Sequence, residues 1–461
     1  MTELTTCYRC KSSPCVCSDG VQLLQGDCRA VLDALPEKHF QMCVTSPPYF
    51  ALRSYLPADH PDKPLEIGSE KSIEDFVATM VEVFRSVWRV LRDDGVLFCN
   101  LGDSYAATGK NRTPEQATNN TTLQGGTQTQ CQSLVQPSKI VSGLKPKDLC
   151  GVPWRVALAL QADGWYLRDA IIWHKPSPMP GSQQDRCTSS YEYIFQLTKR
   201  PVYYWDMEAV REKGLGYGRS ERFRGSGYTN NNSYDNSAKS NDTTGGGRSL
   251  HDDTGRIPRN VLTFASEGFP GAHFATFPRA LPEWCIRAST SERGACPNCG
   301  SPWVRMTDSE RVRTRPGKHS KSYDKTTGEI VDDGMEKPWR DREEIGNRDP
   351  GRHVTSTRTI GWEPGCKCYG WTEGTDPRDG HEVPVIAKSI AMEPVPCRIL
   401  DPFSGAGTSG LAAIGLQRRC TLIELATDYC DQIVKRLRDG LYAKQTKRDD
   451  LPGQQTLFTV H

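Results

Sequence analysis

Two short segments, far apart in the chain, each join a strand-like apolar run to a turn of special geometry. In the first, Met42–Val44 leads into Thr45-Ser46-Pro47-Pro48-Tyr49. In the second, Arg398–Leu400 leads into the glycine-rich run Asp401–Gly410. Ligands of open α/β sheets bind at the carboxyl ends of the strands, where such turns lie. The pair therefore predicts an α/β fold with a ligand site built from both segments.

Helical and strand-like patterns alternate along the rest of the chain. Apolar residues recur at helical spacing from Ile73 to Leu91, after a Ser72/Asp75 pair that suits a helix start, and Gly95 is expected to end that helix. A second helix is expected at 154–162 and a short one up to residue 35. Short apolar runs predict strands at 22–27, 41–45, 96–101, 167–173, 191–198, 399–400 and 422–423. This alternation predicts a mostly parallel sheet with helices on both faces.

Length and composition limit the remaining organisation. A chain of 461 residues can bury a substantial core and is expected to form one large domain with insertions. Three polar stretches, 105–140, 214–256 and 304–360, have few apolar residues and are expected to be mobile insertions. The net charge of +2 excludes a strongly basic tail but leaves room for a local basic groove.

The two motifs resemble those of the S-adenosylmethionine-dependent amino-methyltransferases of DNA. Ser46–Tyr49 resembles the catalytic motif of that family, and Phe403-x-Gly405-x-Gly407 resembles its cofactor motif. The catalytic motif comes first, which is the permuted order of the β-group. The resemblance covers residues 21–200 and 256–440. It implies a Rossmann-like methyltransferase sheet and methyl transfer to a base amine in double-stranded DNA.

The resemblance also implies a set of residues that bind S-adenosylmethionine: Asp27, Phe277, Asp401, Phe403, Gly405, Gly407, Thr408 and Glu424. The two glycines lack Cβ atoms, so backbone N–H groups can approach a ligand closely. Glu424 follows the next strand and is placed to accept hydrogen bonds from ribose hydroxyls. Asp27 is expected to face the adenine ring, although a helix N-cap is the alternative. Asp401 and Thr408 are expected at the amino-acid end, and Thr408 could instead cap a helix.

The Ser46-Pro47-Pro48-Tyr49 run suits a reaction at an exocyclic amine. Such an amine is a poor nucleophile, because its lone pair is conjugated into the ring. Consecutive prolines fix φ and supply no N–H, so the Pro47 carbonyl is presented as an acceptor for an amine hydrogen. Ser46 offers a second partner, and Tyr49 offers a ring face for a base that has left the duplex.

The first residue of this motif bears on the choice of base. In the resembling family, serine at this position is typical of N4-cytosine enzymes and aspartate of N6-adenine enzymes. Ser46 therefore favours N4-cytosine, with N6-adenine as the alternative. A catalytically inactive DNA-binding protein is a further alternative, but the intact motifs argue against it.

Further segments bear on the recognition of DNA. The run that contains Trp173, His174 and Lys175 resembles the motif that lines the target-base pocket, although core packing is the alternative for Trp173. The region 177–260 is the expected target-recognition region. Its arginines could read guanine, bind phosphate or be solvated loop charges: Arg186, Arg219, Arg222, Arg224, Arg248 and Arg256.

The chain contains 18 cysteines, many more than a typical reduced protein needs in its core. Two sets of four have metal-ligand spacing: Cys7, Cys10, Cys15 and Cys17, and Cys296, Cys299, Cys366 and Cys368. Four thiolates are what a closed structural zinc site requires. The alternative is reduced, unligated thiols.

These features give the expected organisation. The parts are a Cys-rich element at 1–20, a catalytic half at 21–176, the target-recognition region, a cofactor-binding half at 261–295 and 397–440, a Cys-flanked insertion at 296–396 and a tail at 441–461. Gln454-Gln455-Thr456-Leu457-Phe458 resembles peptides that bind the bacterial sliding clamp, although both apolar residues could pack on the enzyme itself. A cognate restriction endonuclease is another possible partner. The start of the chain shows no secretory signal and no apolar run is long enough for a membrane span, so a cytoplasmic protein of a bacterium or phage is expected.

Overall fold

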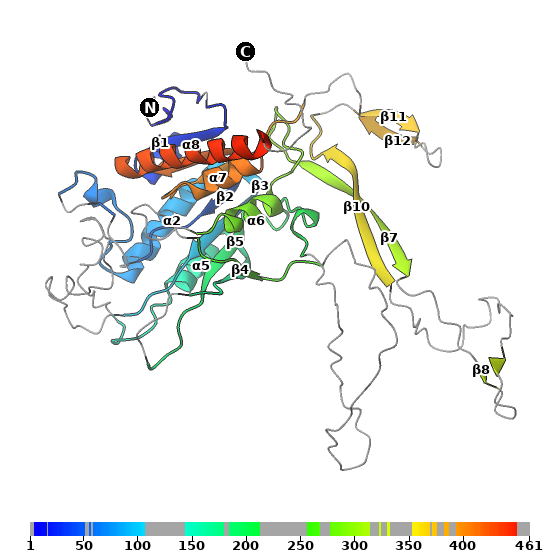
Figure 1. Cartoon of the computed structure of the whole chain (residues 1–461). Coiled ribbons are helices and arrows are strands. Elements are labelled where there is room, and N and C mark those ends of the chain that lie inside the picture. The colour runs from blue at the N-terminus through cyan, green and yellow to red at the C-terminus, as the bar shows by residue number, and fades with distance from the viewer. Residues whose placement is uncertain are drawn as a thin grey trace, which may run out of the picture. The chain divides into compact units, whose positions relative to one another are not determined.

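A sheet of eight strands forms the centre of the part of the chain that the computed structural model describes (Figure 1). The described residues are 4–15, 17–50, 55–56, 59–106, 143–178, 184–212, 256–267, 277–313, 322–323, 330–331, 353–368, 371–375, 382–386 and 393–449. The strand order is β1-β14-β13-β2-β3-β5-β4-β6. The strands are β1 (Val21–Gln25), β2 (Phe40–Thr45), β3 (Leu91–Leu101), β4 (Tyr166–His174), β5 (Tyr191–Thr198), β6 (Val261–Thr263), β13 (Arg398–Asp401) and β14 (Arg419–Glu424). Strand β5 is antiparallel to both neighbours, and the other pairings are parallel.

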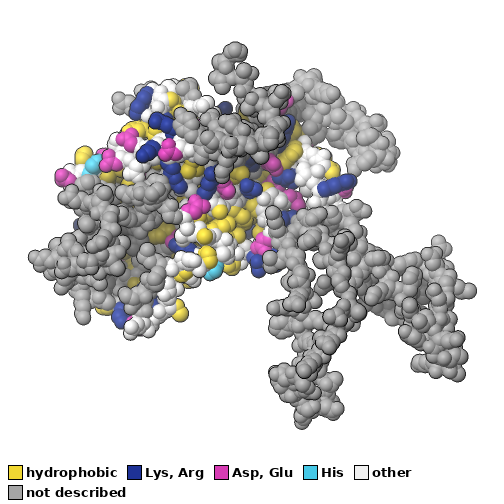
Figure 2. Space-filling model, viewed as in Figure 1, with side chains coloured by type: hydrophobic (Ala, Val, Ile, Leu, Met, Phe, Trp, Pro, Cys, Tyr) yellow, Lys and Arg dark blue, Asp and Glu magenta, His cyan; other side chains and the backbone are white. Residues whose placement is uncertain are grey.

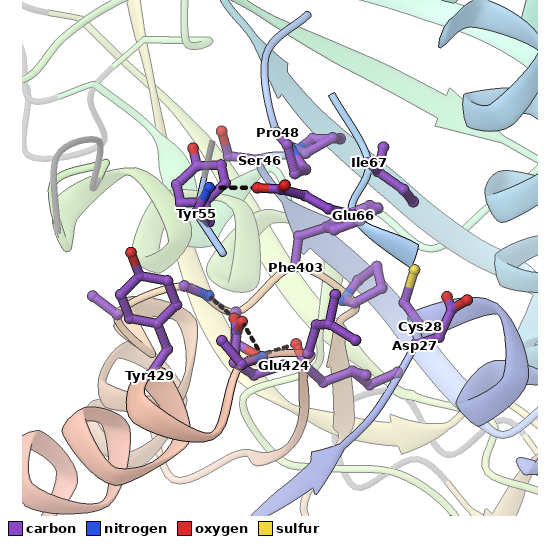
Figure 3. A pocket seen from close by; sticks show the side chains of 18 of the residues that line it. Asp27, Cys28, Ser46, Pro48, Tyr55, Glu66, Ile67, Phe403, Glu424 and Tyr429 are labelled. Carbon is purple, nitrogen blue, oxygen red and sulfur yellow. Dashed lines mark hydrogen bonds between the residues drawn. The ribbon is translucent and has the colours of Figure 1, made fainter. Parts of the chain in front are cut away.

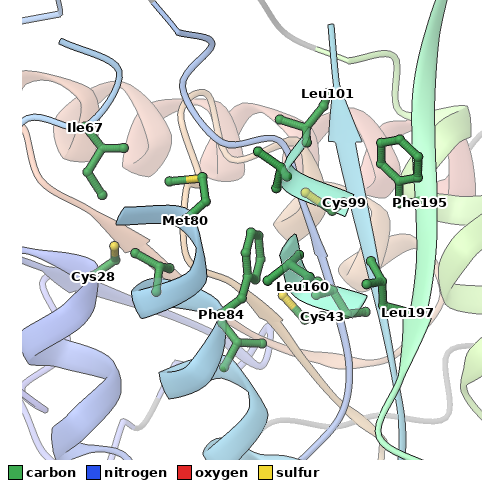
Figure 4. Packing of buried hydrophobic residues seen from close by; sticks show 14 of the residues in the cluster. Cys28, Cys43, Ile67, Met80, Phe84, Cys99, Leu101, Leu160, Phe195 and Leu197 are labelled. Atoms are coloured by element: carbon green, nitrogen blue, oxygen red, sulfur yellow. The ribbon is translucent and has the colours of Figure 1, made fainter. Parts of the chain in front are cut away.

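Helices cover both faces of this sheet, each over its own apolar cluster. On one face lie α1 (Cys28–Ala34), α2 (Ile73–Val90) and α5 (Val152–Ala162). Figure 4 shows Phe84 of α2 and Leu160 of α5 near Leu197 of β5. On the other face lie α6 (Ala280–Ser289), α7 (Thr408–Gly415) and α8 (Thr427–Asp449). The predicted α/β sheet, mostly parallel and covered on both faces, is therefore confirmed.

Helix α2 begins as predicted but ends earlier. The Ser72 hydroxyl accepts a hydrogen bond from the backbone N–H of Asp75 at 3.0 Å, which satisfies a donor of the first turn. The helix ends at Val90, and Leu91 already belongs to β3. The prediction that Gly95 ends the helix was wrong. Gly95 instead lies within β3, where a Cβ would come within 3.1 Å of the Gln41 carbonyl oxygen of the neighbouring strand.

The connections reverse direction between β13 and β2, which are neighbours in the sheet. The chain leaves β2 through α2 and enters β3 on one side. It leaves β13 through α7 and enters β14 on the other side. Loops that diverge in this way leave a crevice at the carboxyl ends of the two strands. Both sequence motifs lie at this position.

The chain divides into two units. Unit 1 comprises residues 1–210, 259–305 and 362–461, and unit 2 comprises 211–258 and 306–361. The predicted target-recognition region, 177–260, is divided between them. Its strand β5 pairs with β3 and β4 in the central sheet. Ile194, Phe195 and Leu197 of this strand are buried.

Short elements complete the described structure. Outside the central sheet, β7 (Trp303–Arg313) pairs with β10 (His353–Pro364), β8 (Ser322–Tyr323) pairs with β9 (Ile330–Val331), and β11 (Trp371–Thr375) pairs with β12 (Glu382–Ile386). Two 3-10 turns, η1 (Lys63–Leu65) and η3 (Glu208–Val210), lie in loops. Most of the three predicted insertions and the clamp-like motif at 454–458 lie outside the described residues.

The surface carries both signs of charge. Figure 2 shows Lys and Arg side chains interspersed with Asp and Glu over the visible face of the described residues. This mixture agrees with the net charge of +2. Among the helices that the structure describes, none is long and apolar enough to cross a membrane.

Candidate functional site

One cavity lies at the carboxyl ends of β1, β2, β13 and β14, where the connections reverse. It encloses about 1060 Å³, including its open mouth. Figure 3 shows Ser46 and Pro48 on one side, Glu424 on the opposite side and Phe403 between them. Most of the predicted catalytic and cofactor residues line it: Asp27, Ser46, Pro47, Pro48, Tyr49, Phe277, Phe403, Gly405, Thr408 and Glu424. The structure thus brings both motifs to a single cavity.

The glycine turn between β13 and α7 forms one wall. Gly405 and Gly407 have φ angles of 51° and 72°, in the left-handed region that favours glycine. The Glu424 carboxylate accepts hydrogen bonds from the backbone N–H groups of Gly405 at 3.0 Å and Ala426 at 3.2 Å. Burial raises the pKa of Glu424 to about 7, although these N–H donors oppose the shift. Glu424 thus places a carboxyl group in the wall, held by the turn itself.

Asp401 has a different place from the one predicted. Its buried carboxylate accepts hydrogen bonds from the Thr45 hydroxyl at 2.7 Å, the Phe403 N–H at 3.1 Å and the Ser409 hydroxyl. Burial raises its pKa to about 6. It is not among the residues that line the cavity. Asp401 instead ties the end of β2, one residue before Ser46, to the glycine turn.

Asp27 and Thr408 line the cavity but also have structural partners. Asp27 is the N-cap of α1 and pairs with the Arg29 guanidinium at 2.7 Å, so its alternative role as a cap is observed. The Thr408 hydroxyl accepts a hydrogen bond from Arg436 at 2.8 Å. Phe277 lies just before α6 in the cavity wall, and the preceding residues 268–276 are outside the described part.

The catalytic motif is supported by a hydrogen-bond network that sequence reasoning missed. The Tyr49 hydroxyl donates to Glu192 at 2.6 Å, and the Asn100 amide donates to the same carboxylate at 2.9 Å. Burial and the Glu192 carboxylate raise the pKa of Tyr49 well above its usual value, so the phenol stays neutral. A Cβ on Gly102 would lie 2.5 Å from the Tyr49 ring, so Gly102 allows the ring to sit against the backbone. Asn100 and Glu192 belong to no motif, and only the pairing of β3 with β5 reveals them.

Ser46 and Pro47 are held by weaker or fewer hydrogen bonds than Tyr49. The hydrogen bonds of the Ser46 hydroxyl are long, 3.4 Å from the Asn100 amide and 3.5 Å to the Tyr49 hydroxyl. No described residue donates a hydrogen bond to the Pro47 carbonyl. The two groups can therefore serve a ligand in the cavity without breaking strong existing bonds.

The three residues predicted for the target-base pocket lie beside the cavity rather than in its lining. Trp173 is 3% exposed and its indole N–H donates to the Phe264 carbonyl at 3.0 Å, so it packs in the core, as the alternative stated. The His174 ring nitrogen lies 3.3 Å from the Thr263 hydroxyl. Lys175 forms an ion pair with Glu192. The same carboxylate accepts the hydrogen bond of the Tyr49 hydroxyl, so Glu192 links Lys175 to Tyr49.

Aromatic residues that no motif predicted complete the lining. Tyr55 and Tyr429 meet edge to face, with ring centroids 6.3 Å apart. The Glu66 carboxylate accepts a hydrogen bond from the Leu56 N–H at 3.3 Å and pairs with Lys63. The two tyrosines give the cavity aromatic surface beside a few polar groups, which is typical of a small-molecule site.

Two of the predicted recognition arginines are described, and both have partners. The Arg186 guanidinium lies 3.7 Å from the centre of the Tyr105 ring. Arg256 pairs with Glu212 at 2.6 Å. The other four lie outside the described residues: Arg219, Arg222, Arg224 and Arg248.

Comparisons with known proteins show which proteins this chain is similar to. The family model of DNA methylases matches residues 40–296. The chain is 36% identical over 273 residues to the type II methyltransferase M.SmaI of Serratia marcescens, which covers 59% of this chain and 76% of that protein. It is 37% identical over 273 residues to M.Cfr9I of Citrobacter freundii, with 59% and 73% covered. Among solved structures, it is similar to the PvuII DNA methyltransferase (cytosine-N4-specific), with a TM-score of 0.43, 13% identity and 92% of each chain covered.

Proposed function

Because this chain belongs to the DNA methylase family, we propose that it transfers a methyl group from S-adenosylmethionine to the N4 amine of cytosine in double-stranded DNA. Membership confirms the resemblance that the two motifs carried. The observation that supports the detailed proposal is the shared cavity, which both the Ser46–Tyr49 run and the glycine turn line.

The cavity suits S-adenosylmethionine in its chemistry. When bound, this cofactor supplies an electrophilic methyl group on a positively charged sulfur. Glu424 would accept hydrogen bonds from the ribose hydroxyls, since each of its oxygens retains acceptor capacity beside the backbone N–H it already binds. Tyr55, Phe403 and Tyr429 offer apolar surface to the adenine and the methionine chain. Gly405 leaves the backbone open for close approach, whereas Gly407 is not in the lining and a Cβ there would come within 2.9 Å of Ile433.

The Ser46–Tyr49 run would hold the target base on the other side. The base has to leave the duplex to reach the cavity, and the fixed Tyr49 ring provides a face on which it can stack. The Pro47 carbonyl would accept one amine hydrogen and hold the nitrogen lone pair out of conjugation. Held in this way, the amine nitrogen would take the methyl group that the bound cofactor supplies in exchange for one of its own hydrogens, which would leave as a proton to water. No covalent bond to the protein is needed.

Ser46 favours cytosine over adenine. It stands where N6-adenine enzymes of this kind typically have aspartate. A neutral hydroxyl can donate to a ring nitrogen and accept from an amine of either base, so the preference for cytosine comes from the family resemblance at this position. The choice of base therefore depends on Ser46 alone.

Nucleoside mass spectrometry of DNA from cells that express the chain tests the proposal. The host should lack its own DNA methyltransferases, and a strain with the Tyr49→Ala variant serves as the matched control. N4-methylcytosine that is present with the wild-type chain and reduced with Tyr49→Ala is the expected result. N6-methyladenine in its place would overturn the base, and no modified base at all, from a folded protein that binds the cofactor, would support an inactive DNA-binding protein.

A further inference from the structure

The two cysteine sets predicted from spacing each come together in space. In each set, the four sulfur atoms lie within 4.8 Å of one another. The N-terminal set joins Cys7, Cys10, Cys15 and Cys17, and the second joins Cys296, Cys299, Cys366 and Cys368. All eight are free thiols in the structure. The second set is assembled across about 70 residues of chain, so its proximity is a property of the fold rather than of the local sequence.

The sulfur separations agree with a tetrahedral metal ion. Four thiolates at the usual zinc–sulfur distance of about 2.3 Å would place their sulfurs about 3.8 Å apart. In the N-terminal set, the Cys7 and Cys17 sulfurs are 4.0 Å apart, and those of Cys10 and Cys15 are 3.7 Å apart. A disulfide would instead bring two sulfurs to about 2.05 Å.

Both Cys-x-x-Cys segments adopt the same turn, although their sequences differ. The N–H of Cys7 donates to the Ser12 carbonyl at 3.0 Å, and the N–H of Lys11 donates to the Cys7 carbonyl at 2.8 Å. The equivalent bonds join Cys296 to Ser301 at 2.8 Å and Gly300 to Cys296 at 2.8 Å. The residue after the second cysteine has a positive φ in both turns, 54° at Lys11 and 70° at Gly300.

The conformation of Lys11 is informative, because lysine adopts a positive φ only at a cost. Lys11 and Gly300 share this conformation at equivalent positions, so both turns place their cysteine pair with the same local backbone geometry. In the second set, the Asn298 amide donates to the Cys368 sulfur at 3.5 Å, which would support a thiolate ligand.

Each set joins separate parts of unit 1. The Tyr8 N–H donates to the Leu23 carbonyl of β1 at 2.6 Å, and its hydroxyl donates to Asp431 of α8 at 2.8 Å. The N-terminal segment is therefore docked beside the cofactor half of the sheet. It offers four sulfurs but few buried apolar side chains of its own, so hydrophobic packing alone gives it little stability.

The second set closes the chain where it leaves and re-enters unit 1. The Ser301 hydroxyl donates to the Gly365 carbonyl at 2.8 Å, which joins the two cysteine-bearing segments. The buried Gln41 side chain of β2 donates to the Gly300 carbonyl at 2.8 Å and accepts from the Arg398 N–H of β13 at 2.6 Å. The set is thus connected to the amino ends of the two strands whose carboxyl ends form the cavity.

We propose that each set binds one structural zinc ion. The first would fix the N-terminal segment on β1 and α8, and the second would join the two segments of unit 1 that flank the insertion between 299 and 366. All four ligand positions are protein sulfurs, so neither ion has an open position for substrate. This inference does not depend on the proposed methyl transfer.

Metal analysis of the full chain, purified without chelator, tests the proposal. About two zinc ions per chain are expected, one for each four-thiolate set. The Cys10→Ser plus Cys15→Ser variant and the Cys366→Ser plus Cys368→Ser variant should each retain about one ion. Cys187→Ser, which changes an exposed cysteine outside both sets, is the matched control and should retain both. Replacement of zinc by cobalt should give the absorption bands of tetrahedral sulfur coordination.

The wild-type chain also provides a test that needs no variant. Titration with a mercurial reagent, followed by a zinc-sensitive dye, should release metal as these thiols are blocked. A metal-free, folded chain in which all eight thiols react at once with a thiol reagent would overturn the proposal. Disulfides within either set, detected by mass spectrometry of non-reduced peptides, would overturn it for that set.

Discussion

Tyr49 is held more firmly than any other residue of the catalytic motif. Its hydroxyl donates to Glu192, whose second oxygen pairs with Lys175, and Asn100 donates to both the hydroxyl and the carboxylate. A phenol fixed at its hydroxyl presents its ring in one orientation. The network therefore suits a stacking surface better than a group that moves during the reaction.

The ring and the hydroxyl of Tyr49 can be separated by substitution. Tyr49→Ala should lower kcat/KM for DNA by about ten- to a hundredfold, since stacking on an aromatic ring is worth roughly 1–3 kcal/mol per base. Tyr49→Phe keeps the ring and should cost only a few-fold. Calorimetry should show that both variants bind S-adenosylmethionine like the wild type. Equal damage from the two substitutions would assign the function to the hydroxyl instead of the ring.

Glu424 predicts a pH dependence of cofactor binding. Its pKa is raised from 4.5 to about 7 by burial, so folding favours the protonated form, and this group destabilises the fold as pH rises from 4.5 towards 7. The ionised carboxylate is the form that accepts hydrogen bonds from ribose hydroxyls. Affinity for S-adenosylmethionine should therefore fall about tenfold between pH 8 and pH 6. Calorimetry across this range should show that the affinity depends on pH in the wild type. In Glu424→Gln the affinity should be weaker and independent of pH. The same pH dependence in both proteins would exclude Glu424 as the titrating group.

At the scale of elements, the turn from β13 to α7 carries the cofactor half of the site. Asp401 fastens it to the end of β2, and Glu424 of β14 accepts a hydrogen bond from its Gly405 N–H. Three neighbouring strands thus hold one short loop. A side chain in this loop would affect both the backbone geometry and the shape of the cavity.

Gly405→Val should abolish detectable binding of S-adenosylmethionine. Valine is strained at a φ of 51°, and its side chain would occupy space beside the cavity. Gly164→Val is a matched control, because Gly164 also has a positive φ, of 113°, yet has open space around its Cβ position. It should lower the melting temperature while cofactor binding persists. Binding by a folded Gly405→Val protein would show that the turn does not contact the cofactor.

The sequence predicted elements well where a local pattern determines them. The apolar runs before Ser46 and Asp401 became β2 and β13, and the helical spacing after Ser72 became α2. Gly95 was misread because a glycine in a strand with close neighbours looks, in sequence, like a helix stop. Asp401 matched a motif, but the Thr45 hydroxyl that binds it comes from β2, 356 residues away in the sequence, and leaves no local signal. The same holds for Glu192, which reaches Tyr49 only because β5 runs antiparallel to β3.

At the scale of the whole molecule, the cavity and the second unit are built from different parts of the chain. Every residue that lines the cavity belongs to unit 1. Unit 2 takes 211–258 from the predicted target-recognition region and 306–361 from the Cys-flanked insertion. Cofactor binding and recognition of a DNA sequence are therefore expected to be separable.

Residues 213–255 offer a way to separate them. The flanking residues Glu212 and Arg256 exchange backbone hydrogen bonds of 3.0 and 2.9 Å, and their side chains pair at 2.6 Å. Chain ends bridged in this antiparallel manner can be joined by a tight two-residue turn without strain. Replacement of 213–255 by Asn-Gly should therefore leave the melting temperature and the affinity for S-adenosylmethionine close to those of the wild type. If the segment takes part in target recognition, site-specific methylation of DNA should be lost, as measured by sequencing that detects modified bases. A variant in which a Gly/Ser linker of equal length replaces the segment controls for the change in length. If either variant retains the wild-type methylation pattern, residues 213–255 take no part in recognition.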